Sequence, residues 1–250
     1  MLPTIATGNV ASALAGEYEV ANSCRFDDGS SDNLSKTFGT NNGGVYKWTY
    51  SFWIKRSTLS EQTITSAKDG SDFGGIKFTT SHQLEVYDYR SGSYILQKIT
   101  NRLFRDVSAW YHIVIANDNS VSSPDLKIYI NGVEETSFST DNEYSQNETN
   151  TWNSNVANTV GCFQAGSQFV DGYMAEFVFI DGQALDPTSL GEFDEDSPTT
   201  WKPIDVSGLT FGTNGFYLDF ENASSLGADV SGNSNNFTVN NLTSVDQSTD

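Results

Sequence analysis

Short runs in which apolar and polar residues alternate recur along the chain from Ser23 onward. Residues 48–55 show the pattern clearly, because alternation places Phe52 and Ile54 on one side of an extended strand and Trp53 on the other. Turn-forming residues separate such runs at spacings of about 8–12 residues. The pattern therefore predicts many short antiparallel strands, as in a sandwich or jelly roll.

Turn signals join some of these runs into hairpins. The runs 75–80 and 83–87 flank Ser81-His82, and Asn131-Gly132 follows a third alternating run. Asn-Gly is the strongest short-range hairpin signal, because both residues adopt the left-handed backbone that a two-residue turn requires. We therefore predict hairpins at both places.

Helix signals occur at one place only, residues 186–193, where Asp186 can cap and Pro187 can occupy the first helical position. The acidic, Pro-containing residues 194–208 are interpreted as a linker. Four segments are expected: an N-terminal arm at 1–22, the main β-sandwich at 23–182, a short helix and acidic linker at 183–208, and a C-terminal β extension at 209–250.

The arm carries small apolar residues such as Val10 and Leu14 without strand alternation. Ordering a backbone costs about 1–2 kcal/mol per residue, and this segment buries too little surface alone to offset that cost. We therefore expect residues 1–22, if they are ordered, to be ordered by contact with another chain, and a disordered tail is the alternative.

Composition narrows the classes of partner. The 250 residues contain 32 acidic and 13 basic side chains, a formal net charge of −19, and 16 Phe, 11 Tyr and 5 Trp. So few basic residues argue against nucleic acid and anionic membrane surfaces as partners. The aromatic content excludes a disordered acidic protein, and no apolar run is long enough for membrane insertion.

Only two cysteines are present, Cys24 and Cys162. Small apolar neighbours favour buried free thiols at both positions, and a disulfide between them is the alternative.

Three segments in order, 110–114, 126–133 and 169–177, read WYHIV, LKIYINGV and FVDGYMAEF. They resemble the laminin-G-like, or concanavalin A-like, jelly roll. The resemblance implies an all-β fold of two antiparallel sheets over about residues 23–182. It leaves function open, because this fold hosts lectins, adhesion modules, glycosidases and virion parts.

The chain also resembles jelly-roll structural proteins of tailed, especially marine, bacteriophages. The segments that carry this resemblance are 8–13, 18–22, 50–56, 216–220, 229–237 and 246–250. The resemblance implies localisation in the virion as a capsid decoration, fibre or tail appendage. Its partners would be other virion proteins and sister copies, bound through residues 1–22, and a glycan on the host surface.

Catalytic motifs are incomplete. Glucanases on this fold carry E-x-D-x-x-E, and the nearest match, residues 192–197, has Ser197 in the sixth place. We interpret it as a solvated acidic turn, and His112 as a hydrogen-bonded sheet residue. The sequence therefore predicts a protein without enzymatic activity. The alternative is a carbohydrate-binding module or a catalytically inactive relative of a β-glucanase.

Two kinds of binding site are candidates. Asp27, Asp28 and Asp32 lie in an acidic turn and offer the oxygen ligands that calcium prefers, although Asp in turns usually serves turn geometry. Trp53 and Tyr129 lie on the sides of their strands opposite the apolar residues. They are candidates for contact with a glycan or a subunit, and packing inside the protein is the alternative.

Overall fold

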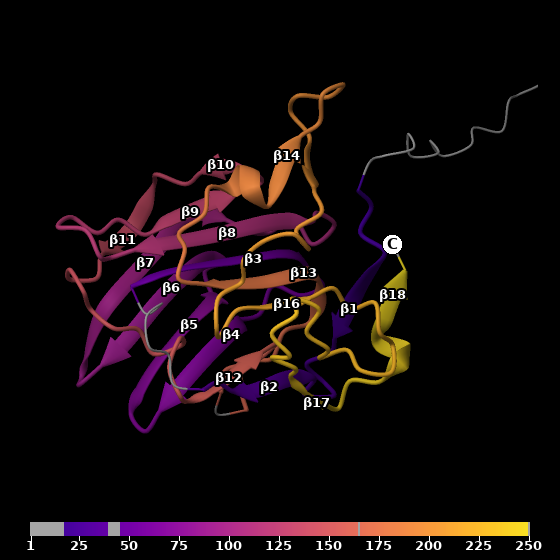
Figure 1. Cartoon of the computed structure of the whole chain (residues 1–250), viewed down its shortest axis with the longest axis horizontal. Coiled ribbons are helices and arrows are strands. Elements are labelled where there is room, and N and C mark those ends of the chain that lie inside the picture. The colour runs from indigo at the N-terminus through magenta and orange to yellow at the C-terminus, as the bar shows by residue number, and fades with distance from the viewer. Residues whose placement is uncertain (1–17, 40–45, 165, 250) are drawn as a thin grey trace, which may run out of the picture.

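Two antiparallel sheets stacked face to face form the protein in the computed structural model, which describes residues 18–39, 46–164 and 166–249 (Figure 1). The strand order of sheet A is β10-β9-β8-β3-β13-β1-β18, with β16 paired to β13, and that of sheet B is β11-β7-β6-β5-β4-β12-β2-β17. The all-β, two-sheet jelly roll expected from the sequence is confirmed.

The strands of sheet A are β1 (Asn22–Phe26), β3 (Lys47–Arg56), β8 (Tyr111–Asp118), β9 (Lys127–Ile130), β10 (Val133–Glu134), β13 (Gly172–Asp181), β16 (Phe216–Leu218) and β18 (Gln247–Thr249). Those of sheet B are β2 (Asn33–Thr37), β4 (Gln62–Asp69), β5 (Asp72–Phe78), β6 (Gln83–Arg90), β7 (Ser93–Leu103), β11 (Phe138–Asn142), β12 (Ala157–Val160) and β17 (Thr238–Asn240).

The main core lies between the sheets and is rich in aromatic rings. Phe52 of β3 stacks on Phe177 of β13 at 5.1 Å, and Trp48 meets Trp152 edge to face at 5.3 Å. Burying a side chain of this kind contributes about 1.5–3 kcal/mol. The inward position of Phe52, expected from alternation, is therefore confirmed.

Both predicted hairpins are present. β5 and β6 are joined across a turn in which His82 has φ 65°, and β9 and β10 are joined at Asn131 and Gly132, with φ 49° and 75°. Positive φ at both turn residues explains why Asn-Gly stands there.

The short helix predicted within residues 183–208 is confirmed, whereas the predicted linker is wrong. Helix is limited to one 3-10 turn, η1 (Pro187–Ser189), although Asp186 caps it as expected by accepting the Thr188 N–H. The supposed linker is a hairpin, β14 (Gly191–Phe193) paired with β15 (Trp201–Pro203). Apolar residues within the acidic stretch, Trp201 above all, drive it onto the outer face of sheet A.

Residues 209–250 add strands to both sheets: β16 and β18 to sheet A and β17 to sheet B. A second 3-10 turn, η2 (Ser244–Asp246), precedes β18. Asp229 closes a turn by accepting the N–H groups of Tyr217, Ser231 and Asn235. The predicted C-terminal β extension therefore belongs to this jelly roll.

The last residues of the predicted arm, 18–22, contact other parts of the same chain. Asn22 begins β1, which pairs with β18, and Tyr18 contacts Glu176 and Tyr217. Residues 18–22 therefore have contacts within their own chain, and attachment to another chain through residues 1–22 stays a prediction. The rest of the arm, residues 1–17, lies outside the described residues.

Cys24 and Cys162 are buried and free, as expected. Burial raises the pKa of both thiols, which makes them poor nucleophiles. In the part of the chain that the structure describes, no helix has the length and apolarity needed to cross a bilayer.

Candidate functional site

The outer face of sheet A brings three neighbouring strands together at Trp53. Its partners across the strands are His112 of β8 and Ala175 of β13. The Trp53 and His112 rings stack with centroids 4.7 Å apart. Stacking on His112 of the neighbouring strand fixes the orientation of the Trp53 indole.

Much of this outer face is covered by the segment that follows β13. Val114, Val178 and Ile180 point outward and form a second apolar cluster with Leu190, Val206, Phe211 and Tyr217. The face therefore has its own small core, which ends beside Trp53.

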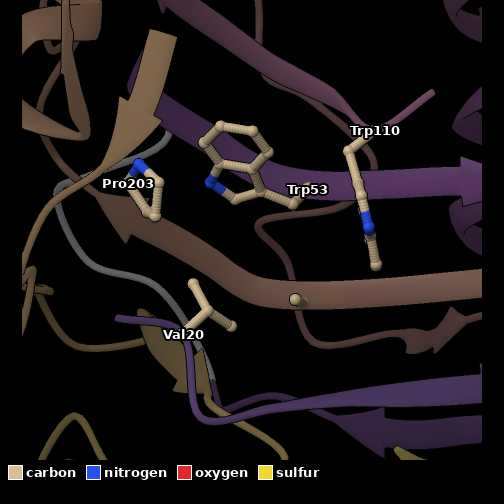
Figure 2. A pocket seen from close by; sticks show the side chains of 5 residues that line it. Val20, Trp53, Trp110 and Pro203 are labelled. Carbon is tan, nitrogen blue, oxygen red and sulfur yellow. The ribbon is translucent and has the colours of Figure 1, made fainter. Parts of the chain in front are cut away.

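An apolar pocket of about 160 Å³ opens where this cover ends. It is lined by Val20, Trp53, Trp110, Ala175 and Pro203. Figure 2 shows the Trp53 indole between Pro203 and Trp110, with Val20 of the N-terminal segment across the opening. Five parts of the chain that are distant in sequence thus build one aromatic pocket.

A wider and more polar cavity of about 470 Å³ adjoins this pocket, with which it shares Val20 and Pro203. Tyr18, Glu19 and Ala21 complete its lining. The exposed Glu19 carboxylate offers hydrogen-bond acceptors at the rim.

Glu176 lies beneath these cavities in a β-bulge of β13, with φ 49°. Its Oε2 accepts hydrogen bonds from the hydroxyls of Tyr18 at 2.9 Å and Tyr217 at 2.5 Å. The side chain is only 6% exposed. Burial raises the pKa of Glu176 to about 7, although both tyrosine hydrogen bonds act in the opposite direction.

His112 is held between two hydrogen bonds and cannot serve as a general base toward Ser51. The indole N–H of Trp201 donates to Nδ1 at 2.8 Å, so in the neutral ring the proton is on Nε2. Nε2 lies 2.8 Å from Ser51 Oγ and therefore donates to it. Burial lowers the pKa of His112 to about 3, so the ring is neutral at physiological pH.

The structure separates the two aromatic candidates. Trp53 lines the open pocket, whereas Tyr129 packs against the second apolar cluster beneath the covering segment. Sequence reasoning missed Trp110, Pro203 and Glu176. Glu176 did carry a signal, because it is a lone carboxylate in the apolar run 174–180, and such residues are often functional when buried.

The predicted calcium ligands are engaged in turn formation. Asp27 accepts the Gly29 N–H and pairs with Arg25, and Asp32 Oδ2 accepts the Asp27 N–H. Among the described residues, no group of three or more acidic, His or Cys side chains is placed to hold a metal ion. Calcium at Asp27, Asp28 and Asp32 stays a prediction, which melting curves with calcium and with chelator would test.

The nearest match to a glucanase motif lies in the β14–β15 hairpin. Glu192 is exposed, and Asp194 accepts the N–H groups of Asp196 and Ser197. The expected solvated acidic turn at this position is confirmed.

The family model of the concanavalin A-like lectin/glucanases superfamily, Laminin_G_3, matches residues 28–190. The chain belongs to this family. The match ends within the covering segment, so β14 to β18, and with them Pro203 of the pocket, lie beyond the part that this family model describes. No curated protein is significantly similar in sequence.

Solved structures share the concanavalin A-like fold at low identity. A candidate carbohydrate-binding protein from Bacteroides ovatus superimposes with a TM-score of 0.60 and 15% identity, over 93% of this chain and 60% of that one. This chain thus spans less than two thirds of that protein.

A heptameric pentraxin from Limulus polyphemus superimposes with a TM-score of 0.46 and 14% sequence identity. The match covers 67% of this chain and 79% of that one. Domains LG4-5 of mouse laminin α1 superimpose with a TM-score of 0.47 and 12% sequence identity. The match covers 75% of this chain and 48% of that one. At such identities the likeness concerns the fold alone.

Proposed function

We propose that this protein is a non-enzymatic glycan-binding jelly roll whose sugar site is the Trp53 pocket and the cavity beside it. The observation that carries the proposal is the pair of indoles, Trp53 and Trp110, in one open pocket on the outer face of sheet A. Membership of the lectin/glucanase superfamily supports it. So does the fold shared with the candidate carbohydrate-binding protein of Bacteroides ovatus.

The two adjoining cavities offer complementary chemistry to a sugar. A sugar ring has an apolar C–H face, which packs on indole, and hydroxyl edges, which need hydrogen-bond partners once they leave water. The pocket around Trp53 supplies the apolar surface, and the cavity containing Glu19 supplies acceptors.

Charge favours a neutral sugar. Neither cavity is lined by Lys or Arg among the described residues, whereas Glu19 lines one of them and Glu176 lies beneath. The net charge of −19 adds a repulsive field for anions. Sialylated and uronic acid-rich glycans are therefore expected to bind more weakly than neutral ones.

The site lacks the groups that glycoside hydrolysis needs. Two carboxyl groups must flank the scissile bond, and in the described lining of the two cavities Glu19 is the one carboxylate. His112 is neutral and donates its Nε2 proton toward Ser51, which is the wrong arrangement for activating a nucleophile.

We also propose that the protein is a structural component of a tailed-phage virion, where the jelly roll presents this pocket to host glycans. The similarity to phage jelly-roll proteins over several segments supports this role. The strongly acidic surface fits a protein displayed in many copies, because repulsion keeps copies soluble until they are docked. Detection of the chain at many copies in purified particles would support this role, and its absence from them would refute it.

Glycan binding is tested on an array of neutral and acidic glycans, followed by calorimetry with the best neutral ligand. We expect Trp53→Ala and Trp110→Ala each to weaken binding at least tenfold, about 1.4 kcal/mol. Tyr94→Ala is the matched control, because Tyr94 is an exposed aromatic residue of sheet B, on the other side of the molecule. Loss of binding in Tyr94→Ala with retention in Trp53→Ala would refute the assignment of the pocket.

A further inference from the structure

The N-terminal segment 18–21 forms one wall of the proposed sugar site. Val20 lines both cavities, and Tyr18, Glu19 and Ala21 line the wider one. These residues belong to no strand, and pairing with β18 begins only at Asn22. The position of this wall therefore depends on contacts made by the side chains of residues 18–21, such as that of Tyr18 with Glu176.

We propose that Glu176 is a positioning residue of the glycan pocket, which holds Tyr18 and thereby fixes the segment 18–21 as the pocket wall. The effect of this docking on glycan binding rests on the proposed function. The docking of segment 18–21 itself can be measured without a glycan.

The geometry gives Glu176 this role. The bulge in β13 turns its carboxyl outward from the otherwise apolar run 174–180. One oxygen, Oε2, then receives the hydroxyls of Tyr18 and Tyr217, which are 3.1 Å from each other. Tyr217 is fixed in β16, so the Tyr18 hydroxyl is the part of this triad that ties down the N-terminal segment.

Docking of the segment is coupled to a proton. Burial raises the pKa of Glu176 to about 7, with added repulsion from Asp219 and Glu221. Release of Tyr18 removes a hydrogen bond that lowers the pKa of Glu176, but it also opens the carboxyl to water. Because burial is the largest cause of the shift, we expect the pKa to fall on release toward the ordinary value of 4.5. The docked form thus takes up a proton more readily, and its population falls as the pH rises through 7.

The other charged or titratable groups near the triad are Asp205, Asp219, Glu221 and His112. Asp205 acts on Tyr18 through its charge, and burial raises the pKa of Tyr18 and of Tyr217 above the neutral range. His112 lines the same cavity as Glu176 and stays neutral, because its pKa is about 3. A change between pH 6 and pH 8 is therefore assigned to Glu176.

Limited chymotrypsin cleavage after Tyr18 measures the undocked population of the full chain. When docking is fast relative to cleavage, the rate is proportional to that population. A synthetic peptide of residues 14–22 corrects for the pH dependence of the protease. We expect the normalised rate to be about tenfold lower at pH 6 than at pH 8. Equal normalised rates would overturn the proposal.

Three variants sharpen the test. Glu176→Gln keeps an oxygen acceptor without a titratable proton, so its normalised rate should be the same at both pH values. Tyr18→Phe remains a chymotrypsin site but lacks the hydroxyl, and its cleavage should rise severalfold at both. Asp205→Asn is the control and should keep the pH dependence of the wild type. Full pH dependence in Glu176→Gln, or a wild-type rate in Tyr18→Phe, would contradict the role of Glu176.

Binding of a neutral glycan then follows from docking. Affinity is expected to be higher at pH 6 than at pH 8 in the wild type and equal at both in Glu176→Gln. If the cleavage results hold while no glycan binds, the positioning of the wall by Glu176 stands and the proposed function fails.

Discussion

The outer faces of the two sheets are covered in different ways. On sheet A, Val114, Val178 and Ile180 are buried under a segment from elsewhere in the chain, and Trp201 of that segment bonds to His112. On sheet B, aromatic side chains cover one another: Phe73 stacks on Tyr89 at 4.9 Å, and Tyr94 meets Tyr89 edge to face at 5.1 Å.

This difference is visible in the strands themselves. Strands β8 and β13 carry nearly continuous apolar runs, as expected where both sides of a strand are buried. Strand β6 alternates instead, with Leu84 and Val86 in the core and Glu85 and Tyr87 on the outer side. A continuous apolar run in an antiparallel sheet thus indicates that another segment covers it, and the edge of that cover is where the pocket opens.

The largest effect on stability is expected at Trp201, which is 8% exposed. Its ring packs so closely on Gly132 and Gly191 that a Cβ at either would lie 2.3 Å and 2.6 Å from it. Trp201→Ala should cost about 3–5 kcal/mol in urea unfolding. Trp201→Phe should cost about 1–3 kcal/mol, since it leaves Nδ1 of buried His112 unpaired. Losses below 1 kcal/mol in both would show that the cover is dispensable.

An intermediate effect is expected from pH, through Glu176. Its pKa is about 7 in the fold against 4.5 in the unfolded chain, so its stabilisation is complete below pH 4.5 and lost as the pH rises through 7. The free energy of unfolding of the wild type, relative to Glu176→Gln, should therefore rise by about 3 kcal/mol between pH 7.5 and 4.5. A difference that does not change with pH would contradict the burial of this carboxyl.

His112 acts in the opposite direction over an overlapping range. Its pKa falls from 6.5 to about 3 on folding, so the stabilisation present above pH 6.5 is lost as the pH falls toward 3. We expect the free energy of unfolding of the wild type, relative to a His112→Asn variant, to fall as the pH is lowered from 6.5, as measured by urea unfolding at each pH. A difference between the two proteins that does not change with pH would show that His112 is not buried as a neutral ring.

The smallest effect on the free energy of unfolding is expected from a substitution on the outer face of sheet B. Tyr94 is 42% exposed and supports neighbours that belong to the same sheet. Tyr94→Ala should therefore lower the free energy of unfolding by about 0.5–1 kcal/mol. A loss as large as that of Trp201→Ala would mean that the two faces contribute equally to stability and would remove the contrast between them.

Local patterns predicted the strands and turns because those depend on neighbouring residues. Alternation placed Phe52 inward and Trp53 outward, and Asn131-Gly132 marked its hairpin. The covering segment was missed because acidic residues and prolines around Trp201 resemble a linker. Its burial depends on a distant surface, which spacing along the chain does not reveal.

The site was only half predictable for the same reason. Trp53 could be found from the face that it occupies, and Tyr129 was selected by the same argument although the covering segment packs over it. Trp110, Val20 and Pro203 come from loops and from β15, and only the fold brings them to Trp53. Glu176 was overlooked because a β-bulge, and not strand alternation, sets its direction.

The most direct test of the central claim uses the five tryptophans as reporters of position. Indole N–H signals are followed by NMR while a neutral glycan selected on the array is titrated into the protein. We expect the signals of Trp53 and Trp110 to shift in a saturable way, while those of the core residues Trp48 and Trp152 stay in place. Saturable binding that leaves Trp53 and Trp110 unmoved would contradict the assignment of the sugar site to this pocket.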